Sequence, residues 1–210
     1  MTEGPAAASP PRRRRARQAR SKATVQRILE ATTALIAEKG AHAVTMSDIA
    51  RRAGMVIGTL YQYFVDRTAI FRAILIDHQA QARELLHHHL AEVREPDDLI
   101  EALVQSFDAY YAMLQRNRLI AGLWSMVQAD PELQAIDIAD TLANAQSVAA
   151  VAARFDPDLD IDRASARHAL LIQFSMYAGM LALQTPGAVA RDIAPAFRMI
   201  LRASLAARDA

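Results

Sequence analysis

Along most of the chain, apolar residues recur at the three- and four-residue spacing of helices that bury one face. In the segment 22–39, for example, Val25, Ile28, Leu35 and Ile36 fall roughly on one stripe. Strand signals are weak, because runs of β-branched residues are short and no Asn-Gly or Asp-Gly turn occurs. The pattern therefore predicts an all-α protein.

Glycine, proline and capping residues divide the pattern into about nine helices. Gly40 and Gly54 are expected to end the first two helices. Thr45 is expected to cap the second helix, with Asp48 in the position of a capping box. The expected helices span 22–39, 45–53, 56–63, 66–93, 96–116, 118–128, 131–155, 161–184 and 188–207.

Composition narrows the class of protein. At 210 residues and 52% hydrophobic content, the chain can bury a core and is not disordered as a whole. It has no cysteine, which excludes disulfides and thiolate metal sites and leads us to expect a cytoplasmic protein. No charge-free stretch of 18 apolar residues occurs, so no membrane span is expected, and residues 1–22 do not resemble a secretory signal.

Charge is distributed unevenly along the chain. Residues 1–22 hold seven Arg and Lys against one Glu, whereas the remaining residues carry a net charge of −5. Three prolines and the run "RRRRARQAR" predict a disordered basic arm over 1–21. This arm is either a solvated tail or a contact for a polyanion such as DNA, and both readings remain open.

The segment 45–67 has the layout of a helix-turn-helix motif: a helix, a tight glycine turn and a short second helix. The major groove of DNA admits one α-helix, which a partner helix holds in place. Two helices of this size cannot bury a core alone, so the helix at 22–39 is expected to brace them. Residues 22–66 are therefore predicted to form a DNA-binding domain.

The stretch "TMSDIARRAGMVIGTLYQYFVDRTAIFRAIL" resembles the DNA-binding signature of the TetR (tetracycline repressor-like) family. The matching positions are Thr45, Ile49, Ala50, Ala53, Gly54, Gly58, Thr59, Leu60, Tyr61, Tyr63 and Phe64. The resemblance implies a transcriptional regulator that binds double-stranded DNA. It also implies that residues 67–210 form a helical domain for effector binding and dimerisation.

The resemblance further implies roles for single residues. Those expected to face base edges are Ser47, Ile57, Gly58, Tyr61 and Gln62. Those expected at phosphates or at the start of the second helix are Thr45, Thr59, Tyr63 and Arg67. Val56 and Ile57 depart from the family pattern, because both are apolar where the family is polar, and Val56 cannot cap through its side chain. Tyr61 suits either the edge of the core or DNA.

Aromatic and methionine side chains concentrate on three helices of the second domain. They fill either an ordinary core or an apolar cavity, and the resemblance implies an effector pocket. The expected lining residues are Phe107, Tyr110, Tyr111, Trp124, Gln128, Phe174, Met176 and Tyr177. Such walls favour a small, largely apolar effector. The helices at 161–184 and 188–207 are expected to form a homodimer that reads a palindromic operator.

The histidines at 87–89 and the pair Glu84-x-x-His87 suggest a metal site at first sight. Consecutive histidines on a helix point about 100° apart, and a di-iron site needs a second Glu-x-x-His, which the chain lacks. The sequence predicts no metal, cofactor or catalytic residue. The prediction is a homodimeric repressor released by an effector. Two alternatives remain: a DNA-binding protein without an effector, and a helical-bundle enzyme or carrier.

Overall fold

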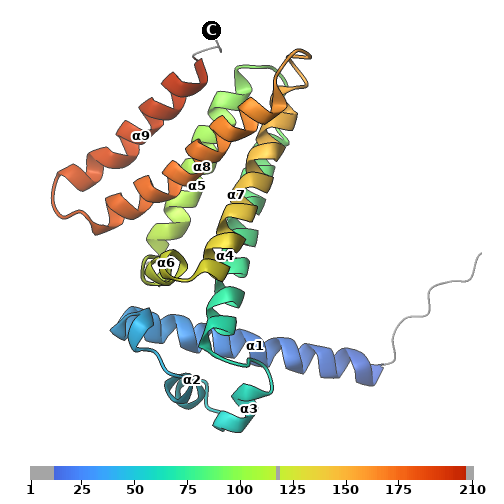
Figure 1. Cartoon of the computed structure of the whole chain (residues 1–210), viewed down its shortest axis with the longest axis vertical. Helices are drawn as coiled ribbons and strands as arrows, with labels where there is room; N and C mark the ends of the chain where they lie inside the picture. The colour runs from blue at the N-terminus through green and yellow to red at the C-terminus, as the bar shows by residue number, and fades with distance from the viewer. Residues whose placement is uncertain (1–11, 117–118, 207–210) are drawn as a thin grey trace, which may run out of the picture. The chain divides into compact units, whose positions relative to one another are not determined.

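The computed structural model describes residues 12–116 and 119–206, and this part of the chain is helical without any strand (Figure 1). The all-α prediction is therefore confirmed. The elements are α1 (Arg12–Lys39), a 3₁₀ turn η1 (Ala41–Ala43), α2 (Met46–Arg52), α3 (Ile57–Tyr61), α4 (Arg67–Leu90), α5 (Asp98–Arg116), α6 (Leu119–Ala129), α7 (Pro131–Ala152), α8 (Ile161–Gln184) and α9 (Val189–Ala206).

The breaks between helices follow the local chemistry that the sequence indicates. Thr45 Oγ1 accepts a hydrogen bond from the Asp48 amide at 3.2 Å, and Asp48 Oδ2 accepts one from the Thr45 amide at 3.2 Å, so the expected capping box is present. Gly40 and Gly54 have positive φ angles of 79° and 65°, which a residue with a side chain rarely adopts. Asp66 caps α4 by accepting from the Ala69 amide at 2.8 Å.

The start of α1 differs from the expectation. The helix begins at Arg12, inside the segment 1–21 that was expected to be disordered, while residues 1–11 lie outside the described part. The prediction of disorder rests on three prolines and on the run "RRRRARQAR". Arginine, alanine and glutamine are nevertheless strong helix formers, so propensity alone can extend a helix whose later turns are packed.

The chain forms two compact units, unit 1 (1–73) and unit 2 (74–210). Their boundary lies inside α4, seven residues after the expected one at 66/67. One reason is Arg67, whose Nη1 donates to the carbonyl oxygens of His42 and Val44 and so ties the start of α4 to η1. The core of unit 1 contains fully buried apolar side chains from every helix, among them Ile28, Ile49, Leu60, Ile70 and Phe71.

In unit 2, α8 packs between α7 and α9, α5 packs on α8 and α9, and α6 packs on α7 (Figure 1). One core cluster joins the end of α4 to α5 and α7 through Leu90, Leu103 and Val148. A second joins α5, α8 and α9 through Phe107 and Phe197, whose ring centroids are 4.8 Å apart. None of the helices in the described ranges is long and apolar enough to cross a membrane.

Candidate functional site

Helices α2 and α3 with the turn between them form the first candidate site. The Gly54 turn leads to Val56, which stands at the N-cap of α3 without a side-chain hydrogen bond, as its apolar side chain requires. Leu60 is fully buried and fastens the helix to unit 1. Because α3 is only five residues long, this single anchor leaves most of its surface outside the core.

The residues that were expected at base edges are all exposed, Ser47 on α2 and the other four on α3 or at its C-cap. Ile57 is 40% exposed and Tyr61 is 51% exposed, and Ser47, Gly58 and Gln62 are exposed as well. Tyr63 is 36% exposed and Thr59 is half-buried. One large side chain of α3 is thus buried in the core of unit 1, while aromatic, amide and hydroxyl groups of this segment are accessible to solvent.

Gly58 shows that the outer surface of α3 is not crowded by the protein itself. Its backbone is helical, and a Cβ atom placed there would meet no heavy atom within 4 Å. Neither backbone conformation nor internal packing therefore requires glycine at this position.

Two of the expected site residues have bonds inside unit 1. The Thr45 hydroxyl belongs to the capping box and also donates to Asp48 Oδ2 at 2.6 Å. Arg67 holds two backbone carbonyls, as described above. Of the two roles that the resemblance left for Thr45, the structure shows the one at the start of the second helix.

Ion pairs join α1 to α2 beside this surface. Asp48 accepts from Lys39 Nζ at 2.5 Å and from Arg51 Nη2 at 2.7 Å, and Arg52 pairs with Glu38. The hydrogen bond from Lys39, followed by that from Thr45, holds the pKa of the Asp48 carboxyl well below its usual range. Arg51 and Arg52 are therefore both paired within unit 1.

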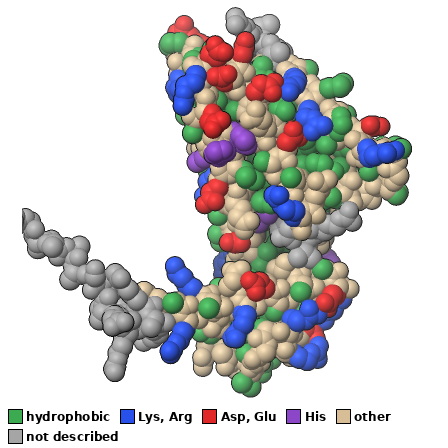
Figure 2. Space-filling view, turned by 180° about the vertical axis from the view of Figure 1, so that it is seen from behind, with side chains coloured by type: hydrophobic (Ala, Val, Ile, Leu, Met, Phe, Trp, Pro, Cys, Tyr) green, Lys and Arg blue, Asp and Glu red, His purple; other side chains and the backbone are tan. Residues whose placement is uncertain are grey.

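The charge of unit 1 is strongly positive. Residues 1–73 hold 13 Lys and Arg against 5 Asp and Glu, a net charge of +8, whereas residues 74–210 hold 11 against 18, a net charge of −7. Figure 2 shows Lys and Arg side chains prevailing on the visible face of unit 1 and both signs on that of unit 2. A basic surface of this kind attracts polyanions.

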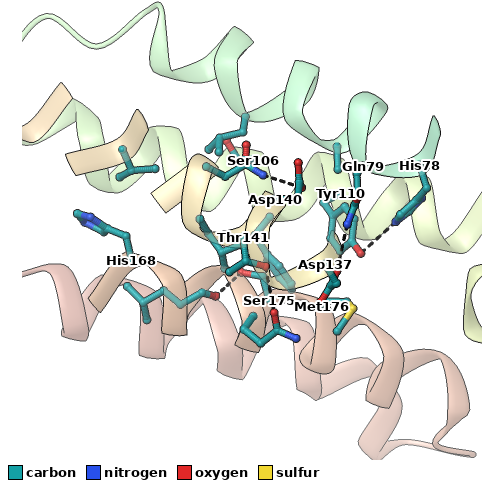
Figure 3. A pocket seen from close by; sticks show the side chains of 18 of the residues that line it. His78, Gln79, Ser106, Tyr110, Asp137, Asp140, Thr141, His168, Ser175 and Met176 are labelled. Atoms are coloured by element: carbon teal, nitrogen blue, oxygen red, sulfur yellow. Dashed lines mark hydrogen bonds between the residues drawn. The ribbon is translucent and has the colours of Figure 1, made fainter. Parts of the chain in front are cut away.

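Unit 2 contains the second candidate site, a cavity of about 140 Å³ between its helices. Most of its wall is apolar, with Leu103, Phe107, Leu123, Val127 and Met176 among the contributors. Polar side chains of α4, α5 and α7 converge at one end (Figure 3). The arrangement combines an apolar body with a small set of polar groups, as small-molecule sites do.

Comparison with known proteins identifies the architecture. Residues 28–74 match the model of a family described as "Bacterial regulatory proteins, tetR family", and residues 97–208 match that of the "Tetracyclin repressor-like, C-terminal domain". The chain belongs to the TetR family. It is therefore a DNA-binding transcriptional regulator of the helix-turn-helix type, in agreement with the sequence-based expectation.

Individual proteins resemble the chain over different shares of its length. The HTH-type transcriptional regulator UidR of Escherichia coli K12 is 28% identical over 87 residues, which cover 41% of this chain and 44% of that protein. The chain thus spans about half the length of the curated relatives that it matches. A TetR-family regulator from Syntrophomonas wolfei superimposes with a TM-score of 0.74 at 15% identity over 89% of this chain and 96% of that one.

A second solved structure of the TetR fold contains a ligand. FadR of Bacillus subtilis in complex with stearoyl-CoA has a TM-score of 0.64 at 16% identity, with 85% of this chain and 98% of that chain covered. At this identity the likeness shows the fold alone.

The cavity of this TetR-family chain contains half of the lining residues that were expected. Phe107, Tyr110, Trp124 and Met176 line it. Tyr111 instead stacks against Phe107, with centroids 6.1 Å apart and planes 9° from parallel. Gln128 is exposed, and its carbonyl accepts a hydrogen bond from Gln134.

Phe174 and Tyr177 are also absent from the cavity, since they are 51% and 46% exposed on α8. Their helical phase explains the correction. Together with Leu170 and Leu181, which are 58% and 57% exposed, they form a stripe at spacings of four, three and four residues. Met176 lies on another face of the same helix and reaches the cavity.

Several polar lining residues were not anticipated from the sequence. They are His78, Gln79, Asp137, Asp140, Thr141, Asn144 and His168. The four on α7 are spaced at i, i+3, i+4 and i+7 and therefore share one face. That spacing is visible in the sequence, but a polar stripe on a helix normally indicates a solvated face, so periodicity alone does not indicate a cavity.

The polar end of the cavity is hydrogen-bonded across helices. His78 Nε2 and Tyr110 Oη are 3.3 Å apart, and Gln79 Nε2 donates to Asp137 Oδ1 at 3.3 Å (Figure 3). Burial lowers the pKa of His78 to about 4, so its imidazole is neutral at pH 7. Burial, with the charge of Asp137 in addition, raises the pKa of the Tyr110 phenol well above its usual range.

The histidines of the last turn of α4 lie elsewhere. His87 and His88 are exposed and line no part of the cavity. Within the described ranges, no group of three His, Asp or Glu side chains is arranged to hold a metal ion.

Proposed function

We propose that the protein is a homodimeric repressor that binds a palindromic operator through α3 and leaves it when a small molecule occupies the cavity of unit 2. The observation that carries the proposal is the outer surface of α3. Ile57, Tyr61 and Tyr63 are 40%, 51% and 36% exposed there, on a unit of net charge +8. Exposed apolar and aromatic groups on a basic surface suit a groove lined by phosphates.

The residues of this surface divide by the contact that each can make. Gln62 can form two hydrogen bonds with an adenine edge, and the side chains of Ile57 and Tyr61 can pack on thymine methyl groups. The hydroxyls of Thr59 and Tyr63 can donate to phosphate oxygens. Arg67 supports the surface by its bonds to η1 and contributes positive charge beside it.

The exposed stripe on α8 supports the homodimer. Leu170, Phe174, Tyr177 and Leu181 form a continuous apolar row, and Met199 and Ile200 on α9 are also more than half exposed. Exposure of such a row to water is unfavourable, and packing against the same row of a second copy would bury it. A two-fold dimer would present two copies of α3 to half-sites about 34–36 Å apart.

Release by a small molecule is supported by the cavity and by α4. This helix is continuous from Arg67, which holds η1 in unit 1, to His78 and Gln79, which line the cavity of unit 2. A ligand that prefers one position of α4 would therefore change the affinity for DNA, and by linkage DNA would weaken the ligand to the same extent. FadR, which has the same fold, was solved with stearoyl-CoA bound.

The test begins with selection of binding sites from random duplexes by the full chain. The selected operator should be a palindrome, and log affinity should fall linearly with log salt concentration. Tyr63→Ala should weaken binding to all duplexes, whereas Gln62→Ala should change the preferred sequence. Gln81→Ala, which removes an exposed glutamine from unit 2, serves as the control.

Two results would contradict the proposal. Failure to enrich any duplex, or equal affinity of the wild type, Tyr63→Ala and Gln62→Ala for the selected operator, would overturn the assignment of α3. A cavity ligand that leaves operator affinity unchanged would overturn release by an effector while leaving DNA binding intact.

A further inference from the structure

The middle of helix α7 directs polar side chains toward the cavity. Asp137, Asp140 and Asn144 line the cavity, while Ile138 and Leu142 are 57% and 48% exposed. A helix packed in a bundle normally has the opposite arrangement. Polar groups in an apolar cavity are unfavourable unless they form hydrogen bonds or ion pairs. Each of these groups is therefore expected to have such a partner.

Most polar groups of the cavity have a partner within unit 2. Asp140 forms an ion pair with Arg83 and accepts from Asn144 Nδ2 at 2.9 Å. Thr141 Oγ1 donates to Gln173 Oε1 at 3.2 Å (Figure 3). His78 is neutral and bonded to Tyr110. These side chains are satisfied without a ligand.

Asp137 differs from these side chains in its charge, not in its hydrogen bonding. Its carboxylate accepts hydrogen bonds from the amides of Gln79 and Gln173, but no lysine or arginine in the described ranges forms an ion pair with it. Burial raises the pKa of the Asp137 carboxyl above its usual range, and the neighbouring Asp140 charge adds to this effect. Among the described residues, Asp137 is therefore a partly buried carboxylate without a counter-charge.

Asn144 supplies an unused hydrogen-bond acceptor. The residue is 6% exposed, and its Oδ1 atom has no hydrogen-bond partner in the described part of the chain. Trp124 Nε1 is the corresponding unused donor. Asp137 and Asn144 are seven residues apart on α7, about 10 Å along the helix axis. The α7 wall of the cavity is thus suited to a ligand that carries hydrogen-bond donors and a positive charge.

We propose that the ligand of this cavity is an organic cation, with an apolar body and a protonated amine that binds the Asp137 carboxylate. An ammonium group has three N–H donors and a full positive charge. These match the Asp137 carboxylate and the free acceptor of Asn144 on α7. The rings of Phe107 and Trp124 and the apolar wall between them accommodate the body of the molecule. This inference rests on the proposed function for its regulatory meaning, but the binding step is tested on the protein alone.

The experiment uses three probes that share one body and differ in the head group: 4-phenylbutylamine, 4-phenylbutan-1-ol and 4-phenylbutanoate. Calorimetric titration of the full chain at pH 7.5 should show the amine binding at least tenfold more tightly than the alcohol and the carboxylate binding most weakly. Equal or tighter binding of the alcohol or the carboxylate would overturn the proposal, and so would the absence of amine binding up to millimolar concentration.

Variants locate the preference at Asp137. Asp137→Asn, which keeps the shape of the side chain, should bring the affinity for the amine down to that for the alcohol. Asp97→Asn makes the same change of charge at an exposed position of unit 2 and should preserve the preference. If Asp137→Asn is unstable by circular dichroism, Asp137→Leu, which needs no polar partner, repeats the test. A preference that survives both substitutions would overturn the site.

Failure of this inference can be told apart from failure of the proposed function by adding the selected operator duplex to the same samples. Release of the duplex by the alcohol or the carboxylate but not by the amine would overturn the cationic ligand and leave the repressor intact. Amine binding that depends on Asp137, in a chain that selects no duplex, would have the opposite meaning.

Discussion

Helices α3 and α7 distribute polarity in opposite ways. Leu60 of α3 is completely buried, while Ile57 and Tyr61 are exposed to solvent. On α7, Asp137 and Asn144 line the cavity, while Ile138 is exposed to solvent. On α3 the exposed apolar and aromatic side chains are the ones proposed to contact DNA. On α7 the polar side chains in the apolar cavity are the ones proposed to bind a ligand. A partner of α3 can approach from solvent at any time, while a partner of α7 must enter the cavity. The two sites therefore require different properties of their units. Unit 1 must pack α3 stably, whereas unit 2 must allow a ligand to enter its interior.

The largest expected effect concerns the packing of α3 in unit 1. Leu60→Ala should destabilise unit 1 by about 2–5 kcal/mol, because it removes the one fully buried side chain of α3. Circular dichroism in urea should record the loss. Fluorescence of Trp124, the single tryptophan, reports unit 2. If the two units unfold separately, the fluorescence transition should stay in place, and Leu123→Ala should shift it instead.

The next effect concerns the apolar stripe on α8. Phe174→Asp should weaken the proposed dimer by at least about 2 kcal/mol, roughly thirtyfold, because a charge would replace an aromatic side chain in the middle of the stripe. Sedimentation velocity at micromolar concentration measures the change. Ile161→Asp makes the same kind of replacement at an exposed position at the start of α8 and should leave association unaltered. Dimers that persist in Phe174→Asp would place the interface elsewhere.

Gly58→Ala separates folding from DNA binding. The variant should be as stable as the wild type or more stable by up to about 1 kcal/mol, since the position is helical and has room for a Cβ atom. If the backbone of α3 approaches DNA closely, the added methyl group should weaken operator binding about tenfold, or about 1.4 kcal/mol. Thermal melting and fluorescence anisotropy with the selected duplex provide the two readings. Unchanged affinity would show that Gly58 does not face DNA closely.

The smallest effect is a pH dependence that originates in the cavity. The pKa of His78 is about 4 in the folded protein, below its usual value of about 6.5, so the unfolded chain binds the additional proton between these values. Stability should therefore fall as the pH falls through this window, by about 1 kcal/mol at pH 5.5. His78→Gln should show a correspondingly smaller loss in urea unfolding at pH 7.5 and pH 5.5. Equal losses in both proteins would mean that His78 does not remain neutral.

Much of the fold was predictable from the sequence because its helix ends are marked by local chemistry. The capping box of Thr45 and Asp48 and the positive φ of Gly54 depend only on neighbouring residues, so the motif at 45–67 could be recognised. The N-terminal extension of α1 is not predicted, because nearby prolines and a run of arginines indicate disorder, although arginine, alanine and glutamine also favour a helix. Fold and family therefore followed from short-range signals.

The cavity was less predictable, because it depends on which face of each helix turns inward. Phe174 and Met176 are two residues apart and equally suited to line a pocket, yet only Met176 does so. For the middle of α7 the usual rule gives the wrong face, since Asp137, Asp140 and Asn144 line the cavity. Periodicity establishes that a helix has two faces, but the packing of the other helices decides which face is inside.

Helix α4 belongs to both units, and this restricts how the chain can be recombined. Arg67, which holds η1, and His78, which lines the cavity, are eleven residues apart, close to three full turns of one helix. A single inserted residue between them would rotate one relative to the other by about 100° and separate them by a further 1.5 Å or so. Hybrids that combine the first unit of one family member with the second unit of another must therefore preserve the residue count of this helix.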